Sequence, residues 1–206
     1  MNYWSSKAVE LYQSAGDFFS ARQIGMIKAL AKAIDANDDY TGKHSEHVAV
    51  LMAELGRSLD FSVEETSLAY FAGLVHDIGK IGVPESILNK PARLTEMEFA
   101  YIKRHPDVGA DILGEIAGFE KIAEAIRYHH ERYDGRGYPH ALKGDNIPIL
   151  SRMLTLCDAY DAMTTTRCYR SPVSKEAALK EIKELSGIQF DPVISGNFLE
   201  MIQSQQ

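Results

Sequence analysis

The sequence predicts an all-α fold. Apolar residues recur at spacings of three and four in several segments, two capping boxes mark helix starts, and the alternation of β-branched residues expected of strands is absent. With 206 residues, the chain can bury most of its apolar surface without disulfides or a structural metal. We expect an N-terminal helix or linker over residues 1–22 and a helical bundle with long loops over residues 23–206.

The first half of the bundle is expected to contain four helices. One follows a cap at Ser20, and the next runs on from His44 to about residue 59. Capping boxes at Ser62 and Thr95 start two more, because the hydroxyl and a carboxylate three residues later satisfy each other's backbone donors. The helix that begins at Ser62 should end at His76.

Further helices are expected to lead into His130, past Asp158, and onward from Ser174 and Asp191, where an Asp cap precedes a proline. Residues 79–94 and 131–148 are rich in Gly, Pro and Asn, which predicts long loops. Each loop follows a pair of adjacent residues of metal-binding type. We therefore expect the loops to border a site built on helices.

Composition narrows the class of function. Hydrophobic residues make up 45% and charged residues 25%, no apolar run approaches a bilayer span, and the N-terminus lacks a secretory pattern. We expect a cytoplasmic protein without a membrane span. The net charge of −7 argues against binding to DNA or RNA polymers, but it allows a small phosphorylated ligand. Cys157 and Cys168 form no disulfide framework and have no zinc-finger spacing.

Candidate metal ligands gather at helix ends. Neighbouring helical residues point about 100° apart, so an adjacent pair serves one cluster only where a helix ends or where the cluster holds more than one metal. Asp158 would be a buried carboxylate and needs a partner. The other candidates are two adjacent pairs and two single histidines: His76 with Asp77, His129 with His130, His44 and His105.

Five imidazoles and two carboxylates are too many ligands for one tetrahedral zinc and suit two ions. Asp77 is the natural bridge, because a carboxylate can bind two metals through its two oxygens. Nitrogen and oxygen ligands favour iron, manganese, cobalt, nickel or zinc. Two such ions would lower the pKa of a shared water and hold both oxygens of a phosphoryl centre. The expected chemistry is phosphoester hydrolysis.

Six ordered motifs resemble the HD-GYP family, a branch of the HD phosphohydrolases, from about residue 25 to the C-terminus. The motifs are Thr41-Gly42-Lys43-His44, His76-Asp77-Ile78-Gly79-Lys80, His105-Pro106, His129-His130-Glu131, Asp134-Gly135-Arg136-Gly137-Tyr138-Pro139 and Asp158-Ala159-Tyr160-Asp161-Ala162-Met163-Thr164.

The resemblance implies hydrolysis of the bacterial second messenger cyclic di-GMP to linear pGpG, GMP or both by a metal-bridged hydroxide. It assigns one ion to His44, His76, Asp77 and Asp158. It assigns the other to Asp77, His105, His129 and His130. Iron or manganese comes first among the metals, with cobalt, nickel or zinc as alternatives.

Tyr40 stands where some family members place a glutamate that binds a third metal. A phenol is a poor substitute for a carboxylate at neutral pH, so we expect two ions.

Other residues gain roles from the resemblance. Lys80 would hold a phosphate oxygen or the bridging water and would assist Asp77 in catalysis, although it could simply be a helix-end cation. Asp161 would pair with Lys80 or occupy a polar helix face. Arg167 and Arg170 would bind substrate phosphates through their guanidinium groups.

Tyr138 would contact substrate, since the family's Gly-Tyr-Pro loop borders the site. The glycines of this loop would permit positive φ. His47 and His140 lie outside the matched ligand positions and are expected to be structural or exposed.

Two alternative functions remain open at the level of sequence. One is hydrolysis of another nucleotide, such as cyclic GMP-AMP. The other is a catalytically weak binding module that signals to a protein partner through the Gly137-Tyr138-Pro139 loop. A homodimer is a further expected assembly.

Overall fold

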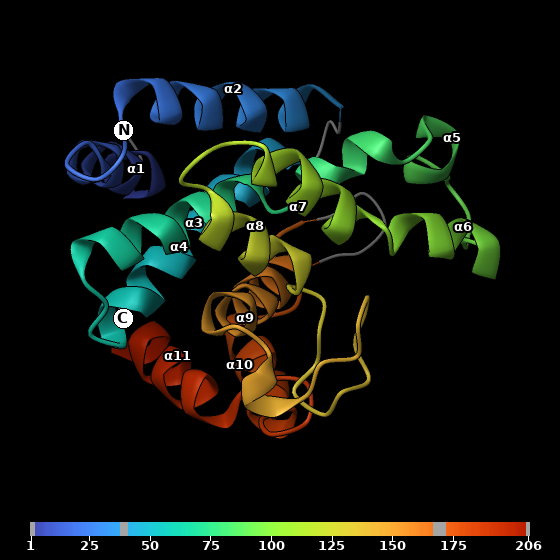
Figure 1. The fold of residues 1–206 in the computed structure, drawn as a ribbon. Coiled ribbons are helices and arrows are strands. Elements are labelled where there is room, and N and C mark those ends of the chain that lie inside the picture. Colours follow the sequence, from blue (N-terminus) through green and yellow to red (C-terminus); the bar gives the residue numbers. More distant parts are fainter. Residues whose placement is uncertain (1–2, 38–40, 167–171, 205–206) are drawn as a thin grey trace.

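The computed structural model describes residues 3–37, 41–166 and 172–204, which form helices and no strand (Figure 1). The predicted all-α fold is confirmed. In chain order, the elements are α1 (Tyr3–Ala15), α2 (Ala21–Asn37), α3 (Thr41–Ser58), α4 (Val63–Val75), η1 (Ile78–Gly82), α5 (Glu85–Leu88), α6 (Glu96–Ile102), α7 (His105–Gly114), α8 (Glu120–Arg127), η2 (Gly144–Asn146), α9 (Ile149–Thr164), α10 (Lys175–Glu184) and α11 (Pro192–Ser204).

Helices α3 and α4 form the centre of the bundle. Every residue of α4 from Thr66 to Val75 is buried, because α1, α3, α8 and α9 pack around it. The two central helices approach closely where Gly73 faces Ala49, since a Cβ added to Gly73 would lie 2.6 Å from the Ala49 Cα atom. The ends of these helices that carry predicted metal ligands therefore adjoin a closely packed part of the fold.

Helix starts follow the predicted caps. Ser62 and Thr95 both form complete capping boxes. Ser174 accepts from the Ala177 amide, and Asp191 accepts from the first amides of α11. Ser20 also forms a reciprocal pair with Gln23 at the start of α2.

The two predicted loops differ in the structure. Residues 131–148 are irregular apart from the short η2. The prediction of a loop over residues 79–94 is wrong in part, since most of η1 and all of α5 lie within it. Each of these elements is stabilised by main-chain bonds over three or four residues, such as the Lys80 amide to the Asp77 carbonyl, and is too short to show apolar periodicity.

The N-terminal helix α1 packs against α3 and α4 and buries Leu11 and Ala15. Cys157 is buried, and Cys168 lies outside the described residues. Among the described helices, none has the length and apolar character needed to cross a bilayer.

Candidate metal centre

Three of the predicted ligands are oriented by the backbone of the preceding helical turn. The Nδ1 atoms of His76, His105 and His129 lie 2.8, 2.8 and 2.6 Å from the carbonyl oxygens three residues earlier in the chain. A carbonyl can only accept, so each Nδ1 carries the ring hydrogen. In the neutral ring, the lone pair is therefore on Nε2. Each imidazole has the tautomer that binds a metal through Nε2.

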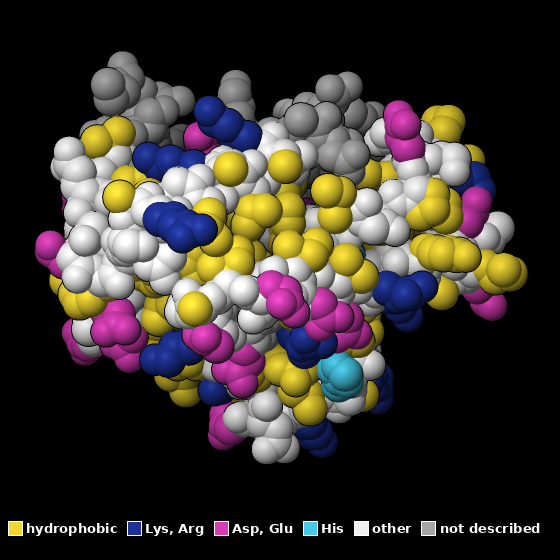
Figure 2. Space-filling view, turned by 45° about the horizontal axis from the view of Figure 1, so that its top comes forward, with side chains coloured by type: hydrophobic (Ala, Val, Ile, Leu, Met, Phe, Trp, Pro, Cys, Tyr) yellow, Lys and Arg dark blue, Asp and Glu magenta, His cyan; other side chains and the backbone are white. Residues whose placement is uncertain are grey.

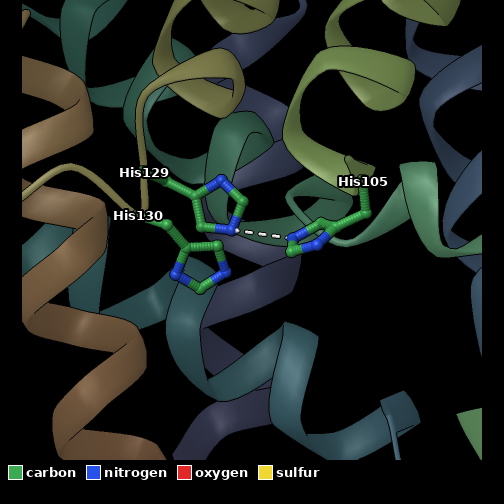
Figure 3. A group of neighbouring side chains, drawn as sticks. All are labelled: His105, His129 and His130. Carbon is green, nitrogen blue, oxygen red and sulfur yellow. Dashed lines mark hydrogen bonds between the residues drawn. The ribbon is translucent and has the colours of Figure 1, made fainter. Parts of the chain in front are cut away.

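The Nε2 atoms of His105 and His129 face each other at 3.3 Å (Figure 3). Burial lowers the pKa of both rings, and the neighbouring His130 lowers that of His129 further. Two neutral rings with hydrogen on Nδ1 cannot share a hydrogen bond through Nε2, because both atoms are acceptors. A cation between them removes the repulsion. This contact therefore fits a metal ion.

Asp77 presents its two oxygens to different imidazoles. Oδ2 lies 3.4 Å from Nε2 of His76, while Oδ1 lies 3.5 Å from Nε2 of His105. The Nε2 atom of His76 is buried and has no hydrogen-bond partner among the described residues. Two groups of potential metal-ligating atoms thus flank one carboxylate. This arrangement suits the bridging role predicted for Asp77.

The ligand atoms form two buried groups, each with its donors within 4.8 Å of one another. His44, His76 and Asp77 form the first group. Asp158 adjoins it through an oxygen 3.2 Å from His44 Nε2. We call these four residues the carboxylate half. The imidazole half consists of His105, His129 and His130.

The structure thus brings all seven predicted ligands together. Both groups are consistent with metal binding.

Asp161 lies one turn after Asp158 on α9 and is buried. Its Oδ2 atom lies 2.6 Å from Nδ1 of His44, and its Oδ1 atom lies 3.2 Å from Nδ1 of His47. The expectation that Asp161 pairs with Lys80 or merely occupies a polar face is wrong. It orients His44, a predicted ligand, and His47 has the structural role expected of it.

Positively charged and polar neighbours keep Asp77 ionised. Burial alone would raise the pKa of Asp77, but Lys80, His76 and His105 hold it well below its usual value. The Lys80 Nζ atom lies 2.6 Å from Oδ2 of Asp77. Asp77 is therefore ionised over the whole physiological range and is available as a metal ligand.

The 131–148 loop brings Tyr138 over the imidazole half. Its ring stacks on His130 at a centroid distance of 4.8 Å and an interplanar angle of 29°. Burial raises the pKa of Tyr138, so the phenol stays neutral. Glu131, next to the ligands, accepts from the His140 amide and fixes the base of the loop. His140 itself is largely exposed.

Glycines near the site act in two ways. Gly135 has φ +81°, the left-handed conformation predicted for the loop. Gly137 does not, and is required for space, since a Cβ there would lie 2.4 Å from the Glu131 Cα atom. Gly79 is also a packing position, because a Cβ would lie 1.9 Å from the His105 carbonyl oxygen.

Three predicted residues, Tyr40, Arg167 and Arg170, lie outside the described residues. One supporting residue and one supporting contact were missed in the sequence. Thr155 lies 2.7 Å from the His129 carbonyl oxygen. The bond between Asp161 and His47 was also missed, although His44 and His47 repeat the three-residue spacing of Asp158 and Asp161, which could have indicated two facing helix surfaces.

Comparison with known proteins identifies the class. The model of a family described as "HD domain" matches residues 28–194. This match covers the whole of the candidate metal centre. The chain belongs to the HD domain family.

Relatives of known function place it further within that family. A cyclic di-GMP phosphodiesterase of Pseudomonas aeruginosa is 39% identical over 170 residues, covering 82% of this chain and 41% of that protein. A 3'3'-cGAMP-specific phosphodiesterase of Vibrio cholerae is 36% identical, covering 81% of this chain and 36% of the relative. The predicted HD-GYP resemblance is confirmed. The chain spans less than half the length of these two relatives.

Solved structures support the fold alone. The cyclic GMP-AMP specific phosphodiesterase of Vibrio cholerae superposes with a TM-score of 0.65 at 22% identity, over 86% of this chain and 48% of that one. A Bdellovibrio bacteriovorus protein described as HDG"Y"P gives a TM-score of 0.64 at 19% identity, over 97% and 63% of the two chains.

Proposed function

We propose that this domain is a metal-dependent phosphodiesterase that hydrolyses a cyclic dinucleotide, with cyclic di-GMP as the first candidate and 3'3'-cGAMP as the second. One observation supports it above the others. The Nε2 atoms of His105 and His129 lie 3.3 Å apart, and the two oxygens of the adjacent buried Asp77 face different imidazoles. The names of the relatives supply the substrate class, since cyclic di-GMP and cGAMP phosphodiesterases both match most of this chain.

The carboxylate half would hold one divalent ion and the imidazole half the other, with Asp77 shared. Iron or manganese is proposed first. When bound, two such ions lower the pKa of a water between them and neutralise charge on a phosphate. The protein's part is to keep the Nε2 atoms and the Asp77 oxygens free of protons and aimed at the ions.

Lys80 is the proposed phosphate contact of the described residues. Its ammonium group donates to Asp77 at 2.6 Å, which places a positive charge next to the shared carboxylate. The side chain is 26% exposed, so a phosphate could approach it beside Asp77. There it would donate to a phosphate oxygen as negative charge increases. Arg167 and Arg170 are proposed to bind the remaining phosphate oxygens, and Tyr138 to contact the nucleotide.

The test is anaerobic purification, elemental analysis of the bound metal, and chromatography of products formed from cyclic di-GMP, 3'3'-cGAMP and cyclic di-AMP. We expect about two transition-metal ions per chain, and pGpG or GMP as products. Asp77→Asn serves as the control for contaminating activity. Two bound ions without turnover of any of the three substrates would contradict the proposal and favour a binding module.

A further inference from the structure

Helix α6 stands at the rim of the metal centre with its apolar side chains exposed. None of its residues is buried, and Phe99 is 43% exposed. In Figure 1, α5 and α6 project from the right of the bundle. On the right of Figure 2, hydrophobic side chains gather on the surface. The helix is nevertheless well anchored, because Glu98 completes the capping box and pairs with Lys90 at 2.7 Å. This anchored, solvent-facing helix presents an aromatic ring beside the proposed active site.

Phe99 and Lys103 are four residues apart and share one face of α6 and its C-terminal cap. The Lys103 Nζ atom lies 4.9 Å from the ring centroid of Phe99 and 5.4 Å from that of Tyr138. The two rings are edge to face, with centroids 6.5 Å apart. Since Tyr138 stacks on His130, a continuous series of rings leads from a metal ligand to the surface.

We propose that Phe99, Tyr138 and Lys103 form the subsite for a nucleobase of the substrate, and that Lys103 makes this subsite prefer guanine to adenine. This inference rests on the proposed function. Every base has a flat π surface that stacks on an aromatic ring, and an exposed ring beside a phosphate-binding centre is the arrangement that such stacking requires.

The preference follows from the edges of the bases. A base that stacks on Phe99 or Tyr138 replaces the ammonium over that ring and places its own edge next to Nζ. Guanine offers two adjacent acceptors there, O6 and N7, whereas adenine offers N7 beside an amino donor. An ammonium is a donor only, so it binds the guanine edge and is repelled by the adenine amino group.

The first test separates stacking from chemistry. Phe99→Leu is expected to raise the KM for the dinucleotide about tenfold, with little change in kcat, because a stacked base is lost. Tyr101→Leu is the matched control, since Tyr101 is an aromatic on the same helix with similar exposure, 46%. An unchanged KM in Phe99→Leu, or an equal rise in Tyr101→Leu, would overturn the subsite.

The second test addresses base preference. Lys103→Gln should reduce the ratio of kcat/KM for cyclic di-GMP to that for cyclic di-AMP about tenfold. Lys180→Gln removes the same charge from the exposed surface of α10 and should leave the ratio unchanged. A ratio that stays at the wild-type value in Lys103→Gln would contradict the role of the ammonium.

The proposed function and this inference fail in different ways. Bis(p-nitrophenyl) phosphate has no base, so its hydrolysis reports on the metal centre alone. If the wild type hydrolyses neither this ester nor any cyclic dinucleotide, the proposed function fails. If the wild type hydrolyses cyclic dinucleotides and the Phe99 and Lys103 variants behave like it on every substrate, only the base subsite fails.

Discussion

The two halves of the metal centre orient the same ligand type with different supports. In the carboxylate half, His44 lies between Asp158 at 3.2 Å and Asp161 at 2.6 Å. In the imidazole half, His105 and His129 are oriented by main-chain carbonyls, and His130 is stacked under Tyr138. His76 of the carboxylate half is also oriented by a main-chain carbonyl, so the two halves differ in the carboxylates that flank His44 and in the ring contact that supports His130.

This difference controls protonation. Burial alone would lower the pKa of His44, but hydrogen bonds and charges from Asp158 and Asp161 raise it to about 9. Burial lowers the pKa of His130 to about 3, with His105 adding to the effect. A metal entering the carboxylate half must displace a proton near neutral pH. A metal entering the imidazole half meets rings that are already neutral.

The largest expected effect removes the link between the halves. Asp77→Asn keeps the shape of the side chain but loses the charge shared by both groups, so both ions should be lost. Hydrolysis should fall about a thousandfold or more. Elemental analysis and a product assay check this. One ion retained at full occupancy would show that the halves bind independently and that Asp77 is not a bridge.

A change of pH should separate the halves in the wild type. Because His44 has a raised pKa, each unit of pH below 9 should weaken metal binding in the carboxylate half about tenfold, or about 100-fold between pH 8 and pH 6. Binding in the imidazole half should change little over this range, since His130 titrates near pH 3. Manganese titrations at the two pH values measure both affinities. Equal slopes for the two ions would contradict the comparison.

Asp161→Asn tests the carboxylate support of His44 without replacing a proposed metal ligand. We expect metal affinity in the carboxylate half to fall 10- to 100-fold. The pKa of His44 should fall as well, so the pH dependence of that half should weaken. Asp111→Asn, an exposed carboxylate paired with Arg127, is the control. A loss of affinity confined to the imidazole half would be inconsistent with the observed bond to His44.

The smallest effect is expected for the neutral support. The buried Thr155 hydroxyl lies 2.7 Å from the His129 carbonyl and 2.9 Å from that of Ser151. Thr155→Val should lower the free energy of unfolding by about 1 kcal/mol and change metal affinity less than about threefold. Denaturant unfolding and metal titration measure the two quantities. A change in affinity as large as that of Asp161→Asn would make the two halves equivalent.

Much of the fold could be predicted from local chemistry. The hydroxyl and carboxylate of the boxes at Ser62 and Thr95 lie three residues apart, so their pairing is set within one helical turn. The short elements η1 and α5 could not be predicted in this way. They contain too few residues for a periodic pattern, and the glycines of η1 and Pro84, which precedes α5, favoured a loop.

The site shows the same division. The ligand positions could be predicted because helix ends and adjacent pairs are visible in the chain. The partner of Asp161 could not be chosen, since Lys80 and His44 are both distant in sequence and only the packing of α3 against α9 decides between them. The proposed role of Phe99 and Lys103 could not be predicted from the sequence either. It depends on their contact with Tyr138, which a loop about 35 residues later in the sequence brings beside them.

The contact at Gly79 sets the width of the whole centre. A Cβ there would overlap the His105 carbonyl, so the main chain of η1 rests directly on the start of α7 with no side chain between them. Asp77 and Lys80 precede and follow this contact, and His105 lies on its other side. The distance from Asp77 to His105 is thus set by direct packing of one main-chain segment on another. Repacking of side chains elsewhere in the bundle does not alter this distance.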